Sequence, residues 1–415
     1  MLTLHCSSSS FRDLLGFRFA AVPYARTPQR FAPSEALISD NDVHAQLGSA
    51  FSALRTTRAQ QCPQTSGTDA PYTEDCLVLN IATGYLPTAS QDGNKEGGGG
   101  KPHALRPILF WIHGGGFTSG SGLDGTFDGT SLSARNDLVV ISSNYRLGSL
   151  GWLGVSESTS PSLRGNLGLG DIISALRWVR AHAVSFGGDP ERISVMGQSA
   201  GAQIVQLLLQ SEAAAGLFES AVVMSGRPWD QANARVNRTV AEMPTSAGGA
   251  NGLAVLQSLG CAPQQATRRA LRASQRDGVE DDKFTSSEGT RRASTNEDDD
   301  PVLACLRRLP TDKFLSSNSI ASKPVIDGLL IRAPTLDLST PARAKAHVNR
   351  VPLLLGTMRD ELGSLGYVPP PGTALGDALT QAGVREPQKT AVVGNASGAF
   401  PLSDVGRDAV QNLTV

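Results

Sequence analysis

The stretch "RISVMGQSAGAQ" (Arg192–Gln203) places one serine, Ser199, between two glycines. The apolar run Arg192–Gly197 predicts a buried strand, and Ala200–Gln210 predicts a helix directly behind the serine. A serine in G-x-S-x-G on a strand-to-helix turn has its hydroxyl lifted above the edge of the sheet, where it can act as a nucleophile. The stretch therefore predicts an α/β fold and nucleophilic catalysis.

The motif alone is weak, because 44 of the 415 residues are glycine. Chance would place glycine on both sides of about one serine in 90, the square of that frequency. The alternative is a structural serine in a tight turn. The context favours catalysis, because side chains at Gly197 and Gly201 would clash with the neighbouring strand and helix. The helix N-terminus would also direct amides and a positive dipole at a developing oxyanion.

A second glycine motif, "HGGG" (His113–Gly116), directly follows the apolar run Arg106–His113. Consecutive glycines let backbone amides approach a tetrahedral oxyanion without steric hindrance. By itself the motif could be no more than a glycine-rich turn. The two motifs in this order, each after a predicted strand, indicate acyl transfer.

The rest of the chain alternates between strand and helix patterns. An amphipathic helix is predicted from Asp171 to about Ser185, and a turn-rich segment with buried aromatic residues over Phe17–Pro33. Further strands are predicted at Cys76–Ala82, Leu138–Gly148, Ser220–Gly226, within residues 323–331 and up to Gly356. The pattern predicts a mostly parallel central sheet with helices on both faces.

Composition excludes some functions. The net charge of −1 gives no basic field for nucleic acid, and no apolar run approaches the ~18 residues of a transmembrane segment. Residues 1–16 are expected to be disordered or mis-assigned. Residues 266–300 are polar with mixed charge, which predicts a disordered insertion. Phosphate binding by the arginine pairs of this insertion is the alternative to a solvated surface.

The chain resembles the type-B carboxylesterase/lipase family, which includes cholinesterases and fungal lipases, over about residues 17–365. The matching blocks are "VPYA", "EDCLVLNI", "WIHGGGFTSGSG", "NYRLGSLGWL", "GNLGLGD", "ALRWV", "FGGDPERISVMGQSAGA", "VIDG" and "VPLLLGTMRDE". The resemblance implies an α/β-hydrolase fold. It also implies that residues 17–415 form one carboxylesterase-type domain from which the C-terminal part of the fold is missing.

The resemblance assigns roles to individual residues. Ser199 matches the nucleophile, and Glu361 in "RDE" matches the acid of the catalytic triad. Gly115, Gly116 and Ala200 match the oxyanion donors. His113 would then shape the oxyanion loop and would not be the base. Judged from the residues alone, Glu361 follows an apolar strand, and an exposed loop carboxylate is the simpler interpretation.

The cysteines fit the same family. Cys62 and Cys76 match its first disulfide, and Cys261 and Cys305 match the second, whereas Cys6 has no counterpart. No C-x-x-C pair is present, so we expect no metal site, and the chemistry calls for no cofactor.

Two kinds of sequence signal bear on cellular location. Candidate glycosylation sequons at Asn237, Asn395 and Asn412, with the cysteines and the resemblance, point to secretion. The N-terminal "MLTLHCSSSSFRD" does not have the pattern of a signal peptide.

The general base is the element that the pattern lacks. The six histidines are His5, His44, His103, His113, His182 and His347, and none of them follows Glu361. In the family the base lies beyond the acid, consistent with a chain order of serine, acid and histidine. His182 is expected on the exposed side of a helix, and His347 at the wrong end of a strand. We expect a truncated or mis-spliced product, or alternatively a selected pseudoenzyme.

The predicted function is a carboxylic ester hydrolase acting on a small-molecule or lipid ester through an acyl-enzyme. Gln198 stands where cholinesterases carry glutamate, and the Cys62–Cys76 segment has no tryptophan to stack on a quaternary ammonium. A neutral ester is therefore favoured over a choline ester. The alternative is a non-catalytic binding or adhesion member of the family, although such members typically lose the nucleophile that this chain keeps.

Overall fold

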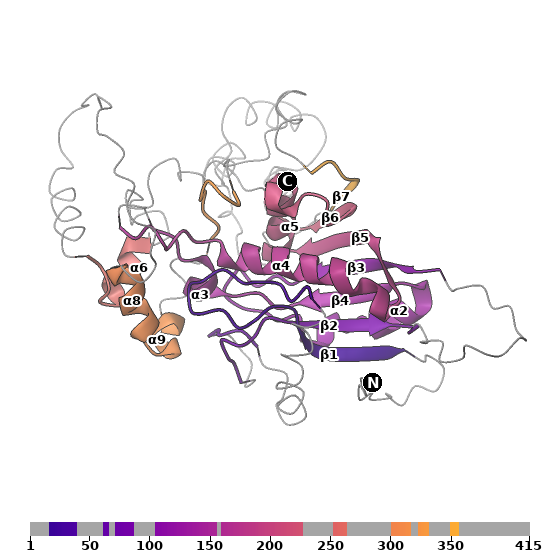
Figure 1. Cartoon of the computed structure of the whole chain (residues 1–415), viewed down its shortest axis with the longest axis horizontal. Coiled ribbons are helices and arrows are strands. Elements are labelled where there is room, and N and C mark those ends of the chain that lie inside the picture. Colours follow the sequence, from indigo (N-terminus) through magenta and orange to yellow (C-terminus); the bar gives the residue numbers. More distant parts are fainter. Residues whose placement is uncertain are drawn as a thin grey trace, which may run out of the picture.

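The computed structural model describes residues 16–39, 61–65, 71–86, 104–155, 159–226, 252–263, 300–316, 323–331 and 349–356. Within these ranges the chain forms one sheet of seven strands in the order β1-β2-β4-β3-β5-β6-β7 (Figure 1). The strands are β1 (Phe17–Pro23), β2 (Val78–Thr83), β3 (Arg106–Ile112), β4 (Val139–Ser143), β5 (Gly188–Gln198), β6 (Ser220–Met224) and β7 (Leu353–Gly356).

The sheet is mixed, with a parallel part that carries the candidate site. β1 and β2 pair antiparallel, and β2 pairs antiparallel with β4. From β4 through β3, β5 and β6 to β7 every pair is parallel. The carboxyl ends of these strands therefore lie at one edge of the sheet, which is where open α/β sheets bind ligands. The mostly parallel α/β fold predicted from the sequence is confirmed.

Helices flank this sheet. The described α-helices are α2 (Thr130–Asn136), α3 (Gly148–Trp152), α4 (Leu167–His182), α5 (Ala200–Gln210), α6 (Gly252–Ser258), α8 (Pro301–Arg308) and α9 (Thr311–Ser316). Short 3-10 helices occur at η1 (Gly125–Phe127), η2 (Ala183–Phe186) and η3 (Glu212–Ala214). Both α4 and α5 pack against β5, and α2 contacts β2 and β4. The main hydrophobic core lies between these helices and the sheet.

Helix α4 buries the face that its sequence pattern predicts. Ile172, Ala175, Leu176 and Val179 are all fully buried. Its predicted start was wrong, because the helix begins one turn earlier, at Leu167. Gly168 in this first turn allows a close approach, because a Cβ on it would lie 2.6 Å from the Trp152 ring.

A second, smaller core joins α6, α8 and α9, which Figure 1 shows grouped beside α3. The Cys261–Cys305 disulfide links the segment after α6 to α8. Asp300, predicted as the last residue of a disordered insertion, is buried and folded. Its carboxylate accepts hydrogen bonds from the Val302 and Leu303 amides and caps α8. Residues 1–15 and 266–299 lie outside the described residues.

Four other sequence predictions need correction. The segment predicted as turn-rich begins with strand β1, because its pairing with β2 compensates for a weak local strand pattern. The strand predicted over Leu138–Gly148 ends at Ser143, and residues 323–331 contain no strand. β7 forms, but it is not core-like: Leu353, Leu354 and Leu355 are 42%, 65% and 52% exposed. Apolar composition alone did not distinguish buried from exposed strands.

Candidate active site

Ser199 occupies a sharp turn between β5 and α5. Its φ and ψ are 55° and −122°, a conformation that L-residues rarely adopt. Its amide donates to the Met224 carbonyl at the end of β6 (3.0 Å), and its carbonyl accepts from the Gln203 amide in α5 (3.0 Å). The half-buried serine is thus held at the carboxyl edge of the sheet in a strained conformation.

The glycines on either side of this turn have no room for a side chain. A Cβ on Gly197 would lie 2.4 Å from the backbone of Gly201, and a Cβ on Gly201 would lie 2.1 Å from the Ile112 carbonyl oxygen. Both contacts are with backbone atoms, which cannot move aside as a flexible side chain could. The motif therefore has this spacing because helix α5 starts in direct contact with the end of β3.

The "HGGG" segment runs alongside the serine. In the β3–β5 pairing Ile112 lies opposite Gly197, so the residues that follow the two strands leave the sheet together. A Cβ on Gly114 would lie 3.2 Å from the Ser199 Cβ and 2.8 Å from the Gln198 carbonyl oxygen. The structure therefore brings together the two glycine motifs that the sequence predicted to cooperate.

Two carbonyl contacts orient the amides of this loop. His113 Nδ1 lies 2.8 Å from the Gly114 carbonyl oxygen, and the Gly115 carbonyl accepts hydrogen bonds from the Thr118 and Ser119 amides (3.1 and 3.0 Å). In a trans peptide the N–H points opposite to the C=O. The Gly115 and Gly116 amides therefore point away from the His113 ring and away from the Thr118–Ser119 turn, respectively.

Among the described residues, three backbone amides in this region have no hydrogen-bond acceptor: those of Gly115, Gly116 and Ala200. Ala200 is the first residue of α5, where the amide has no carbonyl one turn earlier within the helix. Gly115 and Gly116 have φ values of +108° and +63°, which favour glycine. Such an arrangement can bind an anionic oxygen next to the serine.

His113 is buried and neutral. Burial lowers its pKa to about 4, and its ring stacks on Tyr145 with centroids 4.3 Å apart. The Tyr145 hydroxyl donates to the His113 carbonyl (2.9 Å). Since the Gly114 carbonyl can only accept, Nδ1 carries the proton and is committed to that contact. This geometry suits a residue that shapes the loop.

His182 is in a different environment from the one expected. It is half-buried rather than exposed, with Nε2 2.8 Å from the Leu37 carbonyl oxygen and its ring 4.8 Å from that of Trp178. It ends α4, shortly before β5 begins, whereas Ser199 follows the far end of β5. It is therefore remote from the serine along the strand, consistent with the prediction that His182 is not the base.

Several predicted site residues lie outside the described residues. These are Glu361, the sequon residues Asn237, Asn395 and Asn412, and the histidines His5, His44, His103 and His347. The structure does show the Cys62–Cys76 disulfide, with a Cα–Cα distance of 5.0 Å, and the Cys261–Cys305 disulfide at 5.7 Å. These are the two pairs that the family resemblance implied. Within the described ranges, no group of three or more acidic, histidine or cysteine residues could hold a metal ion.

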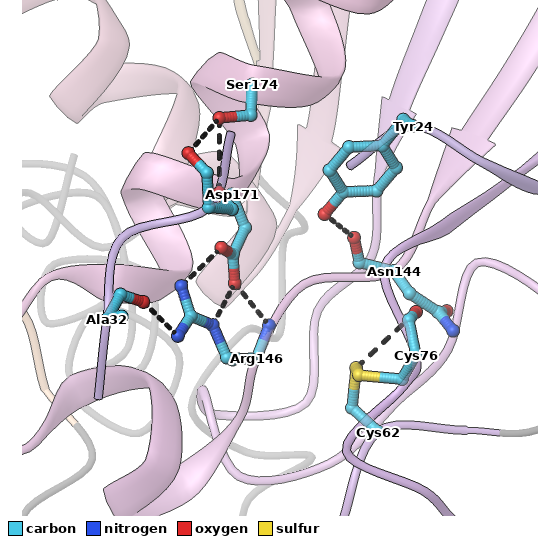
Figure 2. A network of polar contacts seen from close by, with 9 residues as sticks. Tyr24, Ala32, Cys62, Cys76, Asn144, Arg146, Asp171 and Ser174 are labelled. Atoms are coloured by element: carbon cyan, nitrogen blue, oxygen red, sulfur yellow. Dashed lines mark hydrogen bonds and ion pairs between the residues drawn. A yellow bond between two sulfur atoms is a disulfide. The ribbon is translucent and has the colours of Figure 1, made fainter. Parts of the chain in front are cut away.

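A buried ion pair in the loop after β4 was missed in the sequence. Arg146 Nη2 lies 2.7 Å from Asp171 Oδ1, and its Nε and backbone amide lie 2.8 and 3.0 Å from Oδ2 (Figure 2). Its Nη1 donates to the Ala32 carbonyl at 2.7 Å. Burial lowers the pKa of Arg146, but the Asp171 carboxylate outweighs burial and raises it. The pair ties the loop after β4 to helix α4.

None of the described helices combines the length and the apolar character needed to cross a bilayer.

Comparison with known proteins identifies the family. The model of the Carboxylesterase family matches residues 7–374. Among curated relatives, the para-nitrobenzyl esterase of Bacillus subtilis is 34% identical over 220 residues, which cover 50% of this chain and 40% of that protein. Mouse neuroligin-2 is 35% identical over 251 residues (52% and 28%). Chicken acetylcholinesterase is 37% identical over 227 residues (54% and 27%).

The chain thus covers less than half the length of each of these relatives. A solved carboxylesterase of Geobacillus stearothermophilus superimposes with a TM-score of 0.62 at 24% identity, covering 99% of this chain and 71% of that one. This likeness supports the fold alone, whereas the family match spans most of the sequence. The chain belongs to the carboxylesterase family.

Proposed function

We propose that this protein is a serine hydrolase of carboxylic esters in which Ser199 is the nucleophile. The observation that carries the proposal is the strained Ser199 turn at the start of α5, in contact with the Gly114–Gly116 loop. Membership of the carboxylesterase family supports ester hydrolysis at the family level. Acetylcholinesterase and para-nitrobenzyl esterase are among the relatives.

The proposed reaction has two steps. Ser199 Oγ attacks the ester carbonyl carbon, and its proton passes to a base while the carbonyl oxygen becomes an oxyanion. The Gly115, Gly116 and Ala200 amides donate to that oxygen, and each such donor typically contributes roughly 3–4 kcal/mol of transition-state stabilisation. The alcohol then leaves with a proton, and water hydrolyses the acyl-serine by the same route.

The acid and the base complete the triad. We propose Glu361 as the acid, on the strength of its match to the family motif. His113 is committed to the Gly114 carbonyl, and His182 to the Leu37 carbonyl. No histidine follows Glu361 in the sequence, so we propose that turnover by this 415-residue chain is weak. Loss of a triad member lowers kcat by ~10⁴–10⁶ and leaves residual catalysis.

For the substrate we propose a neutral small-molecule or lipid ester. Gln198 is exposed directly before the nucleophile and carries no charge. A cationic ester would gain no electrostatic attraction there, so we expect choline esters to be poorer substrates than neutral esters of the same acyl chain.

A non-catalytic binding protein is the second candidate, favoured by the similarity to neuroligin-2. A fluorophosphonate probe separates the two functions, because it reacts with an activated serine. Labelling that is lost in Ser199→Ala but kept in Ser133→Ala, a buried serine in α2, would rule out a purely binding role.

Hydrolysis of p-nitrophenyl butyrate by the purified chain tests the catalytic proposal. We expect slow turnover that Ser199→Ala abolishes, whereas Glu361→Gln should change it little, because no histidine follows the acid for it to orient. Turnover at the rate of an ordinary esterase would show that a base is present after all. Turnover that survives Ser199→Ala would refute the assignment of the nucleophile.

We further propose an extracellular or secretory location. The two disulfides form and persist in oxidising compartments and are rare in the cytosol. Expression in a eukaryotic secretory system tests this proposal: glycosidase treatment should shift the mass, and Asn→Gln at Asn237, Asn395 and Asn412 together should remove the shift. Normal accumulation of the fully reduced protein in the cytosol would contradict it.

A further inference from the structure

The side chain of Gln64 makes hydrogen bonds to both the amide and the carbonyl of Gly120. Gln64 Oε1 accepts a hydrogen bond from the Gly120 amide (2.9 Å), and Nε2 donates to the Gly120 carbonyl (3.0 Å). Nε2 also donates to the Cys62 carbonyl (3.2 Å). The half-buried carboxamide therefore pairs with Gly120 as the backbone of a neighbouring strand would. Its hydrogen bonds to Gly120 and Cys62 are all with backbone atoms.

Gly120 in turn supports the contact that orients the oxyanion loop. Its φ is +105°, and a Cβ there would lie 2.4 Å from His113 Nδ1 and 2.6 Å from the Gly114 carbonyl oxygen. These are the two atoms whose contact fixes the Gly114–Gly115 peptide plane. If Gly120 moved away, the space behind this contact would open, and the Gly115 amide would lose its fixed direction.

Gln64 is itself placed by the first disulfide. Cys62, two residues earlier, is bonded to Cys76, and both residues are buried. Cys76 lies two residues before strand β2, and the Tyr24 amide donates to the carbonyl of the intervening Leu77 (3.2 Å). A continuous path of covalent and hydrogen bonds therefore runs from the sheet through the disulfide and Gln64 to Gly120.

The far end of the same loop is anchored independently. The Gly122 carbonyl accepts from Asn80 Nδ2 (3.1 Å) and Ser142 Oγ (2.6 Å), and the Gly122 amide donates to Asn144 Oδ1 (2.9 Å). These partners lie on or beside β2 and β4. Since Gly122 stays fixed without Gln64, the loss of Gln64 should loosen the loop and should not unfold it.

We propose that Gln64 is a positioning residue for ester hydrolysis: it presses Gly120 against His113 and Gly114 so that the Gly115 and Gly116 amides are held ready for the oxyanion. The proposal rests on the proposed function of Ser199, and it assigns a catalytic consequence to the Cys62–Cys76 loop.

Hydrogen exchange of the full chain tests the structural half of the proposal, and it needs no activity. In Gln64→Ala the amides of residues 113–122 should exchange at least about tenfold faster, while those of α5 keep their protection. Gln64→Glu is the matched variant, because it keeps the shape and one acceptor but places a carboxylate against the Gly120 and Cys62 carbonyls. We expect it to exchange as fast as Gln64→Ala.

Gln257→Ala is the control, because Gln257 is an exposed glutamine on α6. It should leave the exchange of residues 113–122 unchanged. If the amides of residues 113–122 exchanged at the wild-type rate in Gln64→Ala, the proposal would be overturned. Wild-type exchange in Gln64→Glu would also overturn it, because shape and not hydrogen bonding would then hold the loop.

Kinetics test the catalytic half. With p-nitrophenyl butyrate, both Gln64 variants should lower kcat by about 10- to 100-fold with little change in KM, as expected when an oxyanion donor is displaced. A faster-exchanging loop with unchanged kcat, or a change confined to KM, would refute a positioning role. If wild-type protein shows neither turnover nor probe labelling, the proposed function fails, and the exchange experiment still decides whether Gln64 holds the loop.

Discussion

The Cβ position of Gly201 lies 2.1 Å from the carbonyl oxygen of Ile112. Gly201 belongs to the first turn of α5, and Ile112 is the last residue of β3, so this approach joins the nucleophile turn to the strand that leads into the oxyanion loop. One glycine therefore couples the positions of the two motifs on which the proposed chemistry depends.

Gly201→Ala should disrupt this contact. Two backbone segments would have to separate, and we expect a loss of roughly 1–3 kcal/mol in the free energy of unfolding. Urea unfolding measures it, and labelling of Ser199 by a fluorophosphonate should fall as well. Gly125→Ala is the control, because Gly125 has open space around its Cβ position and an ordinary φ. Equal stability of the two variants would contradict the model of the turn.

Ser199→Gly should make the protein more stable than the wild type. Ser199 has a φ of 55° and a ψ of −122°, and a non-glycine residue held in such a conformation costs on the order of 1–3 kcal/mol. Glycine relieves this strain, partly offset by its greater entropy in the unfolded chain, so we expect a net gain of about 1 kcal/mol. Thermal unfolding measures the gain.

Ser199→Ala is the matched control for that measurement. It also removes the hydroxyl but keeps a Cβ, so it should leave stability near that of the wild type. If alanine stabilised the protein as much as glycine, the hydroxyl and not the backbone would be the source of the strain.

Local patterns predicted the centre of the fold and of the candidate site. The helix Ala200–Gln210 has the predicted limits, because an apolar period and a strand-to-helix motif coincide there. The contact between the His113–Gly116 segment and Ser199 followed from parallel strands that end together. β1 escaped prediction because its strand character comes from pairing with β2, some 60 residues later, and not from its own residues.

Long-range polar contacts could not be predicted from the sequence, because they too join residues that lie far apart in the chain. Arg146 and Asp171 are 25 residues apart, and no periodic pattern relates them. Gln64 and Gly120 are 56 residues apart, and the bond uses backbone groups of the glycine, which leave no trace in residue type. Apolar runs also gave a wrong prediction of burial, because burial depends on which elements pack against a strand. Leu354 in β7 lies in such a run and is 65% exposed.

Asp171→Asn should destabilise the protein strongly. It leaves the buried Arg146 guanidinium without its counterion, and breaking a buried pair on one side typically costs 3–5 kcal/mol. Denaturant unfolding measures the loss. Asp189→Asn is the control, because its pair with Arg192 lies at the surface and contributes at most ~1 kcal/mol. Similar losses in the two variants would show that burial of the Arg146–Asp171 pair does not matter.

Stability should fall between about pH 6.5 and pH 4 because of His113. Burial lowers its folded pKa from the ordinary value of 6.5 to about 4. In this window the unfolded chain binds a proton that the folded protein does not, so acid favours unfolding. The contribution is fully present above pH 6.5, and about 3 kcal/mol is lost by pH 4.

His113→Gln should flatten the stability profile in that window, since glutamine keeps a donor for the Gly114 carbonyl and does not titrate. Unfolding in urea at a series of pH values measures both proteins. Glu74 provides an internal control: burial raises its pKa, but its bonds to Arg30 and Thr311 outweigh burial and lower it. Its contribution is lost only below the ordinary value of 4.5, and equally in both proteins. A profile that keeps its full slope from pH 6.5 to pH 4.5 in His113→Gln would show that His113 is not the titrating group.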